Sequence, residues 1–122
     1  INEIPTGNVS ASYVGHMMGN VSNNGNTYVA VGDYTQQWNF ASRSGSATIN
    51  NFDGASFSGV ALGTAPVNPR DFFGNGAGTQ GRTISINGSF FKGGSDPVAA
   101  VGGNFRIGGT DYLAVGSFAA SK

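Results

Sequence analysis

The sequence predicts an all-β protein folded as one closed, eight-stranded antiparallel up-and-down barrel, water-soluble and with a packed apolar interior. The first observation behind this prediction is a near-repeat, because residues 28–34 read YVAVGDY and residues 112–118 read YLAVGSF. Alternate side chains of a strand face opposite ways, so each segment places aromatic rings, an alanine and a glycine on one face. A large ring beside a glycine is typical of a tightly bent sheet, since the missing Cβ leaves room for the ring. The second observation is that no window has a helical period, whereas strand-like segments separated by Gly, Asn, Asp and Ser recur throughout.

The first half of the chain alternates clear strand and turn signals. Asn24-Gly25 is the strongest turn signal, because both residues tolerate the positive φ of a tight hairpin. Ser42-Arg43-Ser44-Gly45 and Asp53-Gly54 are further turns. The strands expected around these turns cover about residues 8–21, 27–40, 46–52 and 55–64.

The second half of the chain has weaker turn signals between its expected strands. A looser stretch contains Pro66 and Pro69, and we interpret GNGAG at 74–78 as a flexible loop beside a weak fifth strand within 71–79. Residues 92–101 are expected to form a connection with one helical turn from Asp96, since Asp caps helices and Pro97 suits a first helical position. The remaining strands are expected at about 82–92, 102–107 and 111–119. Closing the eighth strand on the first would remove exposed sheet edges, and an open β-sandwich is the alternative.

One face of each predicted strand is apolar and rich in rings and glycines, and we assign it to the interior. The opposite face carries mostly Ser, Thr, Asn and Gln, the reverse of a membrane-spanning barrel, which needs an apolar outer band. The residues assigned to the interior are Tyr13, Gly15, Met17, Gly19, Val21, Tyr28, Ala30, Gly32, Tyr34, Trp38, Phe40, Phe57, Gly59, Ala61, Gly63, Ile84, Ile86, Gly88, Phe90, Gly103, Phe105, Ile107, Tyr112, Ala114, Gly116 and Phe118.

Composition limits the remaining classes. The 122 residues suffice for one domain spanning 1–122, and the nine Phe, four Tyr and one Trp argue against disorder. The formal net charge is 0 and the basic residues are scattered, so no nucleic-acid footprint exists. No cysteine is present, which excludes disulfides and thiolate metal sites, and no stretch approaches the length of a membrane helix. Because the chain starts at Ile1 rather than Met, we expect a mature or excised part of a longer protein.

An apolar stripe interrupts the polar outer face. Contiguous exposed apolar residues usually mark an interface, so we predict that this stripe binds a flanking domain or a protein partner. Two other interpretations stay open: the N-terminal segment with Ile1, Ile4 and Pro5 covers the stripe, or the assigned facing is wrong. The predicted stripe residues are Val14, His16, Met18, Val29, Val31, Leu113 and Val115.

The end of the chain resembles a known family. Residues 88–91, 96–105 and 112–119 contain the patterns G-x-F-F, A-x-x-G-G-x-F and A-V-G-x-F. This pattern is similar to the eight-stranded barrel that closes transferrin-binding protein B and related surface lipoproteins and haemophores of Gram-negative bacteria. Earlier segments fit more loosely, through Tyr13-x-Gly15, residues 51–54 and Phe57-Ser58-Gly59.

The resemblance implies a non-enzymatic, secreted or cell-surface, C-terminal barrel module that acts in protein interaction, structural support or secretion recognition. Two departures matter: Phe91-Lys92-Gly93-Gly94 stands where the family has F-[YF]-G-P, and the handle domain that carries much of the ligand recognition is not in the sequence. Transferrin or haem binding therefore cannot be carried over to any residue. A barrel that holds haem or a lipid-like molecule is the alternative function.

No constellation of residues predicts catalysis or a metal site. His16, Met17 and Met18 suggest haem or copper ligation, but Met17 points opposite to its neighbours in a strand, so a surface histidine is the simpler interpretation. Asp53, Asp96 and Asp111 stand at predicted turns, where Asp bonds nearby backbone. No nucleophile elbow, calcium loop or phosphate-binding loop occurs, and no cofactor is expected.

Overall fold

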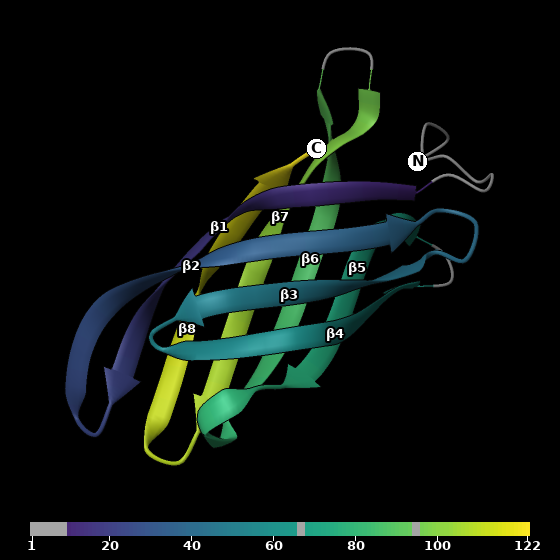
Figure 1. Cartoon of the computed structure of the whole chain (residues 1–122). Helices are drawn as coiled ribbons and strands as arrows, with labels where there is room; N and C mark the ends of the chain where they lie inside the picture. The colour runs from purple at the N-terminus through teal and green to yellow at the C-terminus, as the bar shows by residue number, and fades with distance from the viewer. Residues whose placement is uncertain (1–9, 66–67, 94–95) are drawn as a thin grey trace.

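The chain folds as a closed barrel of eight antiparallel strands in up-and-down order (Figure 1). The structure is a computed structural model that describes residues 10–65, 68–93 and 96–122. Each strand pairs with the next, and β1 also pairs with β8, from Val14 opposite Ser121 to Asn23 opposite Tyr112. This last pairing closes the wall and excludes the open sandwich. The strands are β1 (Ser10–Asn23), β2 (Asn26–Asn39), β3 (Ser44–Phe52), β4 (Ala55–Ala65), β5 (Asn68–Ala77), β6 (Thr83–Gly93), β7 (Asp96–Gly109) and β8 (Tyr112–Ser121), with a short 3-10 turn η1 (Thr79–Gly81).

Two local predictions in the second half are wrong. The segment expected to be a flexible loop from Gly74 onward belongs to β5 as far as Ala77. A Cβ on Gly74 would clash with the backbone oxygen of Ala61, so the glycine serves the close approach of β5 to β4. The helical turn expected from Asp96 is instead the start of β7, which places Val98 in the interior.

The interior is apolar, as predicted, and rings fill its middle. The centre of the Phe90 ring lies 5.2 to 6.0 Å from the centres of four other rings, those of Tyr13, Trp38, Phe40 and Phe72. Tyr34 and Phe118, from the two near-repeats, stack with their ring centres 4.4 Å apart. The near-repeat therefore supplies two strands, one on each side of β1, whose rings meet in the interior.

A bulge in β4 reverses the predicted facing of its second half. Ala47 pairs with Val60 and Ile49 pairs with Phe57, so β4 has one residue more than β3 between these pairs. Gly59 takes a φ of +63° there, a conformation that glycine adopts without strain. After it the facing alternates in the other phase, so Val60 and Leu62 are buried at 1% and 4% exposure. The prediction that Gly59, Ala61 and Gly63 face inward is therefore wrong.

Two residues of β2 also differ from the predicted pattern. Tyr28 does not enter the interior, because its ring is 38% exposed at the end of the barrel. Gln36 is fully buried at the inward position between Tyr34 and Trp38. The prediction omitted it because a polar side chain gives no indication that it faces the interior. The Tyr34 hydroxyl donates a hydrogen bond of 2.7 Å to Gln36 Oε1, whereas Gln36 Nε2 has no partner within the described part of the chain.

A glycine lets the paired strands β1 and β8 approach each other closely where the barrel closes. A Cβ on Gly116 would lie within 3.0 Å of the Met18 carbonyl oxygen, the Met18 carbonyl carbon and Gly19 Cα. All three are backbone atoms, so no side-chain rotation could relieve the contact. Gly116 of the near-repeat is thus required for the close approach of β1 and β8 where the barrel closes.

Candidate functional site

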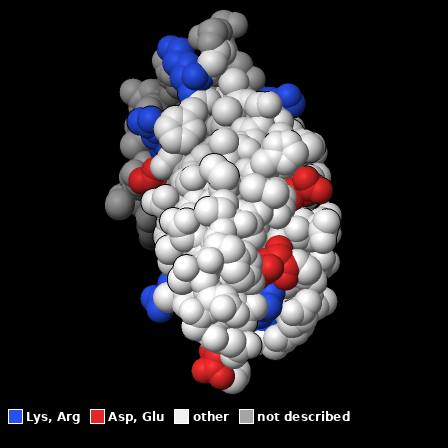
Figure 2. All heavy atoms as spheres, turned by 90° about the vertical axis from the view of Figure 1, so that its left-hand side faces the viewer, with Lys and Arg blue, Asp and Glu red and all other residues white. Residues whose placement is uncertain are grey.

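The seven predicted stripe residues lie on β2, β1 and β8, which are adjacent in the wall. All seven are exposed on the outside of the barrel, and few charged side chains lie around them. Figure 2 shows the side of the barrel that lies at the left of Figure 1, where a broad uncharged surface is bordered by scattered Lys, Arg and Asp. The exposed fractions of the six apolar members are 65% for Val14, 56% for Met18, 61% for Val29, 62% for Val31, 39% for Leu113 and 45% for Val115.

The pairing register arranges these residues as two ridges with β1 between them. Val29 and Val31 form the β2 ridge, and they lie opposite Asn20 and Met18 of β1. On the other side Asn20 lies opposite Val115 and Ser22 lies opposite Leu113. Val14 stands apart from Met18, because His16 lies between them on the same face of β1. We call the outward surface of β2, β1 and β8 that carries these residues, together with the adjoining outward surface of β7, the outer face.

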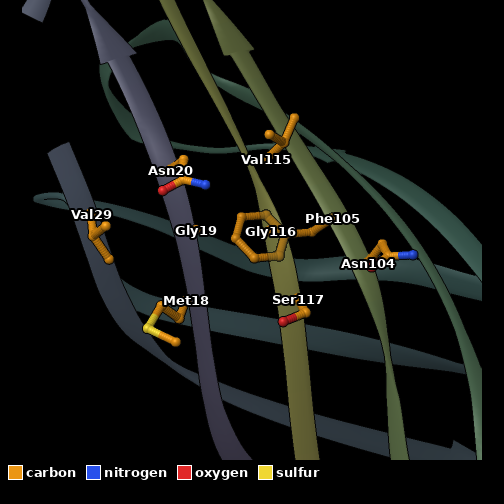
Figure 3. Close-up of a pocket in the computed structure, with 9 residues that line it drawn as sticks. All are labelled: Met18, Gly19, Asn20, Val29, Asn104, Phe105, Val115, Gly116 and Ser117. Carbon is orange, nitrogen blue, oxygen red and sulfur yellow. The ribbon is translucent and has the colours of Figure 1, made fainter. Parts of the chain in front are cut away.

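An open groove runs along β1 between the two ridges. One part of it has a volume of about 620 Å³, and Figure 3 shows Met18 and Val29 on one side and Val115, Ser117 and Asn104 on the other. Gly19, Gly116 and the edge of the Phe105 ring form its floor. A second hollow of about 400 Å³ continues it toward Ser22 and Leu113 and shares Asn20, Val29 and Val115 with the first. The residues that line both hollows are apolar or carry neutral amides and hydroxyls.

His16 forms an ion-pair contact within the outer face. Its Nδ1 lies 3.3 Å from Asp33 Oδ1, and the two side chains are 83% and 64% exposed. Met17 is 1% exposed and faces the interior, so the structure separates it from His16 and Met18 as strand alternation predicts. The three residues thus cannot converge on one haem or copper ion from this strand.

The structure adds an aromatic residue that the predicted stripe omits. Phe91 is 44% exposed and borders a third hollow of about 520 Å³, with Val14 among its other walls. Ala100, Gly102 and Ala119 also line this hollow, and His16 lies at its wall, so the lining is mostly but not wholly apolar. Alternation in the sequence could have revealed Phe91, because it directly follows the inward Phe90.

A polar cluster closes the end of the barrel near η1, and sequence reasoning missed it. Asp53 Oδ2 accepts hydrogen bonds from the hydroxyls of Tyr28 and Tyr112, at 2.6 and 3.0 Å. The Arg82 guanidinium lies 3.7 Å from the Tyr112 ring centre, and its Nη1 donates to the Asp53 backbone oxygen at 3.1 Å. Asp53 was expected to bond nearby backbone at its turn, but its carboxylate joins side chains up to 59 positions away. Such long-range pairing leaves no local signal.

Burial raises the pKa of Tyr34 well above the ordinary tyrosine value. Burial also raises the pKa of Tyr112, and its hydrogen bond to Asp53 and the charge of that carboxylate add to the effect, while Arg82 opposes it. Both rings therefore stay neutral in the folded chain at pH values where an unfolded chain has released the proton.

This difference predicts alkaline destabilisation. Above about pH 10 the unfolded chain binds fewer protons than the folded chain, so the free energy of unfolding falls as pH rises toward the raised pKa values. Urea unfolding followed by tryptophan fluorescence should give a midpoint that is steady from pH 8 to 9.5 and then decreases. The double variant Tyr34→Phe/Tyr112→Phe should show a clearly smaller decrease above pH 10, and an equal decrease would contradict this explanation.

The other candidates for chemistry stay dispersed. Within residues 10–65, 68–93 and 96–122, no group of three His, Cys, Asp or Glu side chains is placed to hold a metal ion. In the same residues no helix combines the length and apolar character needed to cross a membrane. The N-terminal segment with Ile1, Ile4 and Pro5 lies outside the described residues.

Comparison with known proteins identifies the fold. No family model and no curated protein match the chain. Among solved structures, a transferrin binding protein B from Haemophilus parasuis Hp5 matches with a TM-score of 0.70 and 17% identity over 98% of this chain. Intact Ap-TbpB, with its N and C lobes, matches with a TM-score of 0.64 and 16% identity over 99% of this chain. The resemblance predicted from the sequence is thus confirmed for the fold, and the chain spans only 27% of the length of each of these proteins.

Proposed function

We propose that the chain is a non-enzymatic barrel module of a bacterial surface or exported protein, and that its outer face docks against a flanking domain of the same polypeptide. The single observation that carries this proposal is the outer face itself, where six aliphatic or Met side chains between 39% and 65% exposed gather on three adjacent strands. Apolar surface left in water is unfavourable by about 25 cal/mol per Å², so a neighbour that covers it gains free energy. The likeness to transferrin binding protein B supports a surface location and a protein partner.

The size of the outer face favours a tethered partner over a free one. Four strands and the nine residues from Val14 to Ser22 cover roughly 500 Å², from the usual strand spacing and rise. A stable complex of separate proteins buries about 800 Å² on each partner, whereas domain interfaces within one chain are often smaller. A linker supplies a local concentration in the millimolar range, which compensates for a small contact area.

Charge substitutions in the outer face test the proposal. In the intact polypeptide, Val31→Asp and Val115→Asp should weaken docking of the barrel against the flanking part by at least tenfold, because docking would bury an unpaired carboxylate. The rate at which a protease cleaves the linker between the two parts measures the loss, since undocking exposes the linker. Asn87→Asp adds the same charge to the exposed, polar outer side of β6 and should leave binding unchanged.

The substituted valines are exposed, so thermal unfolding of the variants should stay close to that of the parent chain. If both valine variants bind as tightly as Asn87→Asp, the outer face does not dock. If binding is lost only when residues 1–9 are present, the N-terminal segment competes for the same surface and the docking proposal fails for the intact chain.

A further inference from the structure

We propose that docking on the outer face is coupled to protonation of His16, so that an uncharged apolar partner binds more tightly in mild acid than at neutral pH. This inference rests on the proposed function and assigns it a form of regulation. It starts from one juxtaposition: the His16–Asp33 pair lies inside the apolar surface, with Val14 and Met18 on either side of His16 along β1. A partner that covers these two residues must also cover the pair.

The surroundings make His16 the group that decides the local charge. On β1, His16 lies opposite Asp33 of β2 on one side and opposite Ala119 of β8 on the other. Thr35 and Val31 flank Asp33 on β2, and Ser117 and Ser121 flank Ala119 on β8, so neither neighbouring strand turns a second charged side chain toward it. His16 is also the only histidine of the 122 residues.

Docking changes the free-energy cost of the charges on His16 and Asp33, because it removes water from around them. In water an exposed ion pair contributes little, since solvent screens both charges. Under an uncharged partner water is removed, and a lone Asp33 carboxylate beside a neutral imidazole would be a buried net charge. An imidazolium beside the same carboxylate leaves the covered pair neutral overall, which costs less. Histidine is the side-chain type that serves as a charge switch near physiological pH, so the test compares neutral with mildly acidic buffer.

The test uses phenyl groups on agarose as an uncharged apolar probe, with retention of the folded barrel measured at fixed salt at pH 7.0 and 5.5. Retention of the parent chain should rise about two- to fivefold on acidification, which corresponds to the worth of one exposed pair. His16→Gln should show no such rise. Asp33→Asn should show the opposite trend, because acidification then creates a lone imidazolium.

Each outcome separates the proton coupling from the docking surface. Val31→Asp should lower retention at both pH values, which reports on the outer face itself. If Val31→Asp lowers retention but His16→Gln keeps the parent chain's pH dependence, the outer face stands and the coupling is wrong. The coupling is equally wrong if Asp33→Asn follows the parent chain's trend. If Val31→Asp has no effect at either pH, the outer face does not bind the probe, and both proposals fall.

Discussion

Gly116→Ala is expected to destabilise the barrel by about 3 kcal/mol or more, the upper end of the range for overpacked interiors. The added methyl group would meet the backbone of Met18 and Gly19 inside 3.0 Å, so β1 and β8 would have to separate at the seam that closes the wall. Small domains are stable by only 5–15 kcal/mol in total. Thermal unfolding followed by circular dichroism should show a melting temperature lower by more than 10 °C, or a chain that does not fold.

Gly108→Ala is the matched control, because it makes the same change in β7 where a Cβ would find nothing within 4 Å. Gly108 also lacks the positive φ that would strain alanine. Its melting temperature should stay within a few degrees of the parent chain and could rise, since alanine restricts the unfolded chain more than glycine does. Equal losses for the two variants would show that close approach at the seam is not the cause.

Phe90→Ala is expected to cost about 3–5 kcal/mol of unfolding free energy, as for other buried phenylalanines. Phe90 is 1% exposed, and its ring contacts those of Tyr13, Trp38, Phe40 and Phe72, so removing it leaves a cavity that rigid strands cannot collapse. Urea unfolding at pH 7 measures the loss as a lower midpoint with an unchanged slope.

Phe73→Ala provides the comparison for Phe90→Ala. It removes the same ring from the neighbouring strand β5, where the side chain is 50% exposed. The expected loss is below 1 kcal/mol. A loss at Phe73 as large as that at Phe90 would mean that the ring cluster does not hold the interior together.

The alternation of side chains along the strands made most of the fold predictable. The near-repeat placed Tyr34 and Phe118 inside, which the structure confirms, and their rings stack there. The β4 bulge was not predictable, because one extra residue at Gly59 changes the phase of every position after it, and Gly59 reads like any other strand glycine. Gln36 was missed for a related reason, since a polar side chain at an inward position contradicts the pattern used to find that position.

The candidate site divides along the same line. Exposure of Val31 and Val115 followed from strand alternation alone, and their nearness followed once β8 was expected to close on β1. The binding role of the seven stripe residues remains a prediction. The cluster around Asp53 could not be foreseen, because it joins the start of β2, the β3–β4 turn and the start of β8, whose mutual distances depend on the finished barrel.

The pairing of β1 with β8 also has a consequence for biogenesis. Val14 finds its partner Ser121 only after more than a hundred further residues have been synthesised. Such distant pairing is entropically costly and slow to form. Until β8 has been synthesised, β1 has no partner on that side, so the wall keeps two open edges and cannot close into a barrel.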